Sequence, residues 1–186
     1  CIEWFLQKAN QGKLDYDILD DLAGKVNKED APIFLPFLYG ERCPGWQDTR
    51  AGGYFQLKGH HEIGHLYYSI LEGILFNLYQ CYIILSQLGG VPSQIRISGG
   101  IENSRRWLQM AADIFQKKIY TSRVEHASTM GAVAVALKAV DAIESLEAFN
   151  PGIGDDITPD GSMAESYKSR FKRYIEWYEK TSGKDE

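Results

Sequence analysis

The 186-residue sequence has no excess of positive charge, few cysteines and no uninterrupted apolar run of membrane length. Its net charge of −5 argues against nucleic acid as a partner, because phosphate backbones are bound through clustered Lys and Arg. Its three cysteines are widely spaced and form no disulfide framework, so we expect a reduced, cytoplasmic protein. The longest apolar stretch, residues 70–88, is interrupted by Glu72 and by amide side chains, which favours a buried helix over a membrane span.

The sequence also lacks an initiator Met, a secretory signal, internal repeats and low-complexity segments. It begins inside an amphipathic pattern at residues 2–6, so we expect a piece of a longer protein. Its length and its 44% hydrophobic residues can support one domain with its own core.

Helical and strand patterns alternate along the chain. Apolar residues at helical spacing predict helices over residues 2–9, 15–26, 62–87, 102–115, 127–142 and 163–181. Short apolar runs predict strands over residues 33–38, 54–57, 94–98 and 118–121. Loops are predicted over residues 39–52 and 150–162. The alternation indicates an α/β layer. We assign residues 1–186 to one domain, in which the loop and helix of residues 150–186 take part.

A glycine pair separates the predicted strand 94–98 from the helix that follows it. Gly99 and Gly100 carry no Cβ, so a flat or anionic group can approach their backbone closely. The free N–H groups of the following helix would favour negative charge. Asn103 and Ser104 fall in the first turn of that helix, where a short polar side chain can cap it or reach a ligand. A purely structural turn is the alternative interpretation.

A zinc-peptidase pattern, HExxH, is formed by His61, Glu62 and His65 at the start of a predicted helix. Two histidines four residues apart share one helix face, and the glutamate could activate a zinc-bound water. The third ligand is missing, because Tyr68 and Leu71 stand where the longer metalloprotease motif has Gly and His. We therefore predict no metal site and interpret these residues as polar groups near a helix N-terminus. A non-catalytic interaction module is the other alternative.

Other polar features lack the partners that a site would need. Cys43 could be a nucleophile only with His126 as its base, and the aspartates of residues 155–160 miss the calcium-loop spacing. We interpret them as a passive cysteine and a solvated acidic loop. The basic residues of the last predicted helix, Arg170 and Arg173 among them, are interpreted as its solvent face. Small residues in the helix over 127–142 predict close packing against its neighbours.

Several segments together carry a resemblance to a known family. They are residues 3–5, 35–48, 50–55, 65–67, 71–73, 97–100, 107, 111–114 and 125–134. In this order and spacing, from Ile2 to Tyr178, they resemble the C-terminal lobe of the FGGY carbohydrate kinases. The resemblance implies an RNase H-like, actin-like ATPase fold, here as a partial domain with a small sheet flanked by helices.

The resemblance also implies roles for individual positions. Gly99 and Gly100 match glycines that contact the adenosine and phosphate region of ATP. Ser104 matches a small polar residue beside the adenine, and Glu3 falls where a family glutamine approaches the nucleotide. With Asn103, these residues form the nucleotide-binding site that we expect.

The activity implied by the resemblance is transfer of the γ-phosphate of ATP, with Mg²⁺, to a hydroxyl of a sugar or sugar acid. Xylulose and gluconate are favoured over glycerol. The catalytic aspartate and the sugar-binding lobe are expected upstream of Cys1. This chain would then supply the adenine-nucleotide side of the cleft, contain no catalytic residue and be inactive alone. The expected partners are ATP or ADP and a second copy of the protein as a homodimer, with no nucleic acid and no membrane.

Overall fold

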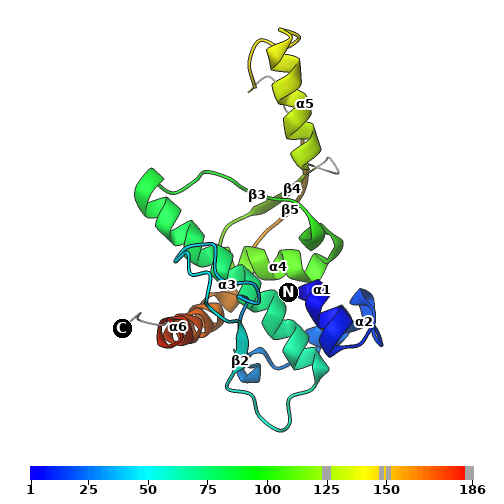
Figure 1. Cartoon of the computed structure of the whole chain (residues 1–186), viewed down its shortest axis with the longest axis vertical. Helices are drawn as coiled ribbons and strands as arrows, with labels where there is room; N and C mark the ends of the chain where they lie inside the picture. The colour runs from blue at the N-terminus through cyan, green and yellow to red at the C-terminus, as the bar shows by residue number, and fades with distance from the viewer. Residues whose placement is uncertain (123–126, 147–148, 150–151, 183–186) are drawn as a thin grey trace.

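The computed structural model describes residues 1–122, 127–146, 149 and 152–182 (Figure 1). Its elements in chain order are α1 (Ile2–Trp4), a π-helical turn (Phe5–Ala9), α2 (Tyr16–Gly24), β1 (Ile33–Leu35), β2 (Gly53–Phe55), α3 (Ile63–Gly89), β3 (Ile95–Ile97), a 3₁₀ turn (Gly100–Asn103), α4 (Arg105–Phe115), β4 (Ile119–Ser122), α5 (Ala127–Ala139), β5 (Ile153–Ile157), a 3₁₀ turn (Gly161–Met163) and α6 (Ala164–Lys180). A further 3₁₀ turn spans Lys28–Asp30. Some residues used in the sequence analysis lie outside the described residues. They are Glu125, His126 and residues 150–151 of the predicted loop.

Two small sheets organise the chain. β1 and β2 pair antiparallel, with Ile33 opposite Phe55. β3 and β4 pair parallel and are joined by α4, while β5 pairs antiparallel with β4. A parallel pair with a helical crossover is the mark of an α/β layer. The predicted α/β class, with a small sheet and flanking helices, is thus what the structure has.

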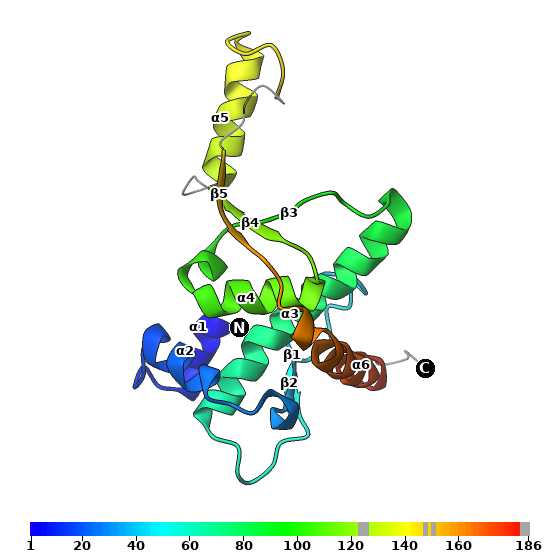
Figure 2. The same cartoon turned by 180° about the vertical axis from the view of Figure 1, so that it is seen from behind.

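α3 is the central helix, and both views show it crossing the middle of the molecule (Figures 1 and 2). Its buried residues lie between Gly64 and Phe76, whereas Leu85 and Leu88 near its end are exposed. By length and hydropathy this helix could cross a membrane, but the core helices of other proteins pass the same test. The burial of its first half within the domain fits the predicted core helix. Leu78, in the second half of the helix, is half exposed.

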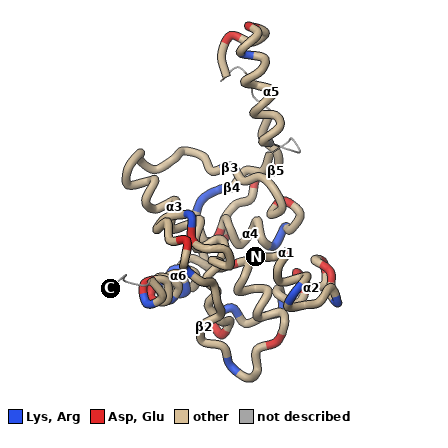
Figure 3. Tube along the Cα trace, viewed as in Figure 1, with Lys and Arg blue, Asp and Glu red and all other residues tan. Residues whose placement is uncertain are grey.

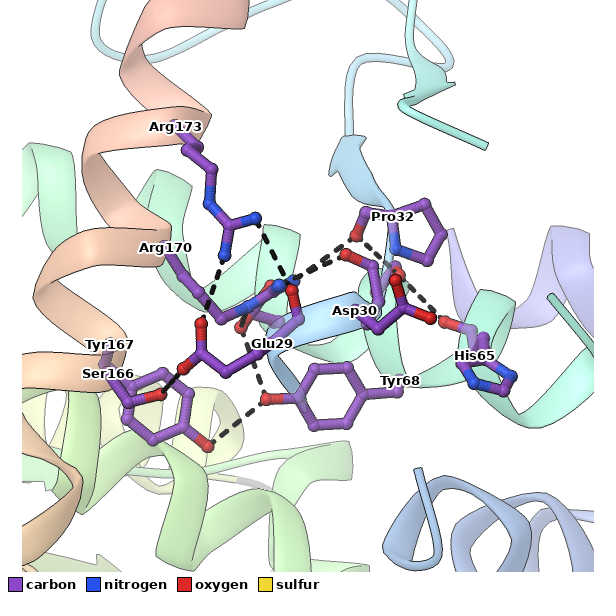
Figure 4. Close-up of polar contacts among 12 residues, drawn as sticks. Glu29, Asp30, Pro32, His65, Tyr68, Ser166, Tyr167, Arg170 and Arg173 are labelled. Carbon is purple, nitrogen blue, oxygen red and sulfur yellow. Dashed lines mark hydrogen bonds and ion pairs between the residues drawn. The ribbon is translucent and has the colours of Figure 1, made fainter. Parts of the chain in front are cut away.

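A buried ion pair between Arg170 and Glu72 holds α6 to α3. Figure 4 shows Arg170 on α6 among these polar contacts. The Arg170 guanidinium donates to both Glu72 carboxylate oxygens at 2.5 Å and to the Ala31 carbonyl oxygen at 3.1 Å. Both charged side chains are buried, and the Tyr68 hydroxyl donates to the same carboxylate at 3.2 Å. The placement of Arg170 on a solvent face was wrong. Its charge points inward because Glu72, on a distant segment, neutralises it there.

The second half of the chain differs from the sequence prediction in two places. Residues 153–157, predicted as loop, form β5 because they pair with β4. α5 was predicted to pack closely, yet it projects from the body in both views (Figures 1 and 2). Of residues 128–139, only Ala134 is buried. This helix also carries no charge before Lys138, near its far end (Figure 3).

Candidate functional site

The glycine turn after β3 has a conformation that requires glycine at its first position. Gly99 has φ 102° and ψ −158°, a region that side chains with a Cβ avoid. Its N–H donates to the Glu102 carboxylate at 2.9 Å, so one donor of the turn is already taken within the chain. A Cβ placed on Gly100 would meet no atom within 4 Å. Gly100 therefore borders open space, while Gly99 shapes the backbone.

Ser104 links the turn to α2. Its Oγ accepts the Trp107 N–H at 3.0 Å, which caps α4 as predicted. The same hydroxyl donates to Asp20 Oδ1 at 3.0 Å. Because α4 begins at Arg105, Asn103 belongs to the preceding 3₁₀ turn and not to the first turn of the α-helix. Both residues line the same cavity as Gly100.

The cavity has a volume of about 780 Å³ and lies between α2, α3 and the β3–α4 turn. Three of the five predicted nucleotide-binding residues line it: Gly100, Asn103 and Ser104. Gly99 and Glu3 adjoin the cavity without being among its described lining residues. Glu3 is connected to the cavity by Tyr16, which lines the cavity and whose hydroxyl donates to the Glu3 carboxylate at 3.1 Å.

The N-terminal turn of α2 supplies lining residues that sequence reasoning missed. Asp15 caps this helix by accepting the Ile18 N–H at 3.0 Å, and Asp17 and Asp20 follow it along the cavity wall. The one available signal was the run of acidic residues at the start of the predicted helix 15–26. That run alone predicts a helix N-terminus, where carboxylates are ordinary. Only the folded structure places it across from Ser104.

The cavity has two chemically different walls. Tyr67, Leu75 and Trp107 give an apolar wall, and the Trp107 ring is fixed because its Nε1–H donates to the Leu71 carbonyl at 3.1 Å. The carboxylates of α2 form the acidic wall, where Arg106 approaches Asp20 at 3.7 Å. An apolar wall with a few fixed acceptors suits a flat ligand that carries N–H donors. A strongly anionic group is disfavoured beside α2.

The HExxH residues lie outside this cavity and are arranged as a helix start. His61 Nδ1 accepts the Lys58 N–H at 3.1 Å, and its Nε2 lies 2.8 Å from the Asp30 carbonyl oxygen. His65 Nδ1 accepts the Glu62 N–H at 3.2 Å. In each neutral ring the proton therefore belongs on Nε2, so no ring lone pair faces outward for zinc. These contacts support the interpretation as polar groups near a helix N-terminus.

Asp30, His60 and His61 bring three possible metal-ligand atoms within 4.8 Å of one another. These ligand atoms already have hydrogen-bond or ion-pair partners among the described residues, however. The Lys58 ammonium lies 2.6 Å from Asp30 Oδ1, and His60 Nε2 contacts the other carboxylate oxygen. Burial lowers the pKa of His61, and this pKa shift favours the neutral ring that donates to the Asp30 carbonyl. The hydrogen bonds of this cluster join the 3₁₀ turn Lys28–Asp30 to the segment before α3.

Residues 1–140 match the family model described as "FGGY family of carbohydrate kinases, C-terminal domain". The chain belongs to the FGGY family of carbohydrate kinases. A gluconokinase of Bacillus subtilis (strain 168) is 32% identical to this FGGY chain over 164 residues, which is 86% of this chain and 32% of the relative. A xylulose kinase of the same strain is 30% identical over 184 residues, which is 97% of this chain and 37% of the relative.

Solved structures give the same family. The gluconate kinase from Lactobacillus acidophilus matches the FGGY chain with a TM-score of 0.87 at 25% identity, covering 98% of this chain and 38% of that one. The xylulose kinase from Rhodospirillum rubrum matches with a TM-score of 0.77 at 26% identity, covering 95% and 36%. The predicted family and its actin-like ATPase fold are thereby confirmed. The chain spans about a third of the length of the curated relatives it matches.

Proposed function

We propose that this chain is the nucleotide-side part of an ATP-dependent carbohydrate kinase, which transfers the γ-phosphate of ATP to a hydroxyl of a sugar or sugar acid. The observation that carries this proposal is the cavity that opens at Gly100, Asn103 and Ser104. The family resemblance, on sequence alone, assigns Gly100 and Ser104 to the nucleotide, and Asn103 lies beside them in the sequence. The names of the relatives, gluconokinase and xylulose kinase, support the acceptor class.

The two walls of the cavity suggest how a nucleotide would lie. An adenine ring would pack against the apolar wall at Trp107 and Leu75, and its exocyclic amine could donate to a carboxylate of α2. The open backbone at Gly100 leaves room for the ribose. The phosphates would extend away from the carboxylates of α2 and from Glu102. Mg²⁺ belongs with those phosphates, and we assign it no ligand in this chain.

The rest of the proposal concerns the whole enzyme. We place the catalytic aspartate and the main sugar contacts in the part of the relatives that this chain does not match, so the chain alone would bind nucleotide and catalyse nothing. Residues 150–186 would belong to the same lobe, since Tyr167 and Tyr174 of α6 join its hydrophobic core. A cytoplasmic homodimer without nucleic-acid or membrane partners completes the proposal.

Calorimetric titration with ADP tests the nucleotide site. The chain should bind ADP weakly, at micromolar to millimolar concentration. Gly100→Trp should abolish the binding because the indole would occupy the cavity. The matched control is Gly59→Trp, since Gly59 is exposed, also has no atom near its Cβ position and lies away from the cavity. Equal ADP binding by the two variants, or no binding by the unaltered chain at millimolar ADP, would contradict the proposed site.

A further inference from the structure

Two cysteines that are far apart in the sequence meet at the surface of α3. Cys81 lies on α3, and Cys43, in the loop between β1 and β2, is among the side chains that interact with its thiol. An independent contact fixes the same neighbourhood, because the Asn77 side-chain amide donates to the Cys43 carbonyl oxygen at 3.0 Å. Asn77 and Cys81 are one helical turn apart and so share a face of α3. Cys43 therefore rests against the face that carries Cys81.

The loop holds Cys43 in place from both sides. Glu41 is buried and accepts the Gly45 N–H at 2.8 Å and the Tyr178 hydroxyl at 2.6 Å. Its other oxygen pairs with the buried Arg50 at 3.2 Å. These contacts anchor the residues just before and just after Cys43 to the core. The loop on both sides of Cys43 is therefore held against the core, close to the face of α3 that carries Cys81.

We propose that Cys43 and Cys81 form a site of reversible disulfide modification, oxidised by a low-molecular-weight disulfide such as glutathione disulfide. The Cys43 thiolate attacks one sulfur of glutathione disulfide, which forms a mixed disulfide on Cys43 and releases one glutathione thiolate. The Cys81 thiol loses its proton to solvent, and the resulting thiolate attacks the Cys43 sulfur and displaces the second glutathione as a thiolate, which solvent protonates. Two protein thiols are oxidised to one disulfide, and glutathione disulfide is reduced to two glutathione thiols.

The order of these steps follows from the surroundings of the two sulfurs. Cys43 is exposed and can reach a solution disulfide directly. Cys81 is half-buried, and burial raises its pKa to about 11, so little of it is thiolate at neutral pH. Cys81 is therefore the resolving thiol, acting on the mixed disulfide that forms beside it. The product would join the loop covalently to α3 and raise the melting temperature.

The experiment equilibrates the 186-residue protein in glutathione buffers of increasing disulfide content, quenches with acid and alkylates the free thiols. Mass spectrometry of the intact protein and of its peptides then counts the thiols and locates the links. The unaltered protein should lose two thiols and give a Cys43–Cys81 linked peptide at every protein concentration. Cys1→Ser should behave in the same way.

Two variants separate the steps. Cys81→Ser should stop at a glutathione mixed disulfide on Cys43, which does not accumulate in the unaltered protein. Cys43→Ser should leave Cys81 unmodified. Melting curves of the reduced variants check that each is folded. A mixed disulfide that persists on Cys43 in the unaltered protein, a Cys43 link to a second chain or a link to Cys1 would overturn the proposal.

Discussion

Removing the charge of Arg170 should strongly destabilise the protein. In Arg170→Met the apolar part of the side chain is kept, but the Glu72 carboxylate loses the two donors at 2.5 Å and stays buried. Burial lowers the pKa of Arg170, but the charge and hydrogen bonds of Glu72 outweigh it and raise the pKa overall. The arginine is therefore charged in the native protein, and its loss leaves an unpaired buried anion.

The magnitude follows from that burial. Arg170 is 0% exposed and Glu72 is 1% exposed, so solvent cannot replace the missing partner. Among the donors described for this carboxylate, only the Tyr68 hydroxyl at 3.2 Å remains. Breaking such a pair costs about 3–5 kcal/mol of unfolding free energy. For a chain of this size, that loss lowers the melting temperature by about 6–20 °C.

Urea and thermal unfolding followed by circular dichroism measure this cost. Arg173→Met is the matched control, because Arg173 lies on the same helix and pairs with Glu29 at 3.4 Å, but both side chains reach solvent. It should cost about 0–1 kcal/mol. The double variant Glu72→Leu/Arg170→Met should recover much of the loss, since no buried charge is left. Equal costs for the two arginines, or additive costs for Glu72 and Arg170, would refute the reasoning.

Three smaller perturbations test other parts of the chain. Gly99→Ala should cost about 1–3 kcal/mol in urea unfolding because of its φ of 102°, and a cost near that of Gly59→Ala would contradict this. Ser104→Ala removes the cap of α4 and should cost about 1 kcal/mol in urea unfolding, and ADP binding should weaken. An unchanged urea midpoint would argue against the cap. The pKa of His61 is lowered, chiefly by burial, from an ordinary value of 6.5. As the pH falls, this residue therefore takes up a proton in the unfolded chain before it does so in the folded chain. Stability should fall as the pH drops below about 6.5, and His61→Gln should flatten this fall in melting curves; an unchanged slope would show that other groups cause it.

Helical periodicity located α3 and α6 well, since an apolar stripe at 3.6-residue spacing is a local property of the sequence. It failed for Arg170 because a basic residue within such a pattern is ordinarily solvated. The partner that draws it inward, Glu72, lies on another helix. β5 was missed for a similar reason. Asp155 and Asp156 resemble a loop, and the strand exists through its pairing with β4, where Ile157 lies opposite Ile119.

The candidate site also contains residues that a local sequence pattern reveals and residues that only tertiary packing brings together. Gly100, Asn103 and Ser104 follow one another after a strand, so a single stretch of sequence reveals them. Asp20 belongs to a helix that reaches the cavity only through packing, and its bond to Ser104 joins residues far apart in the chain. No local pattern encodes such a contact.

The structure also changes what the glycine pair does. The sequence alone predicts an anion site at this pair, where the free N–H groups of the following helix would favour negative charge. In the folded chain the Glu102 carboxylate accepts the Gly99 N–H at 2.9 Å and the Ser122 N–H at 3.2 Å, which places a negative charge at the turn itself. A phosphate at that point would face repulsion and would have to displace a bond already made. In the proposed site the pair offers a ligand the absent Cβ of Gly100, and hence space for the nucleoside end of ATP, and the phosphates would bind away from this turn.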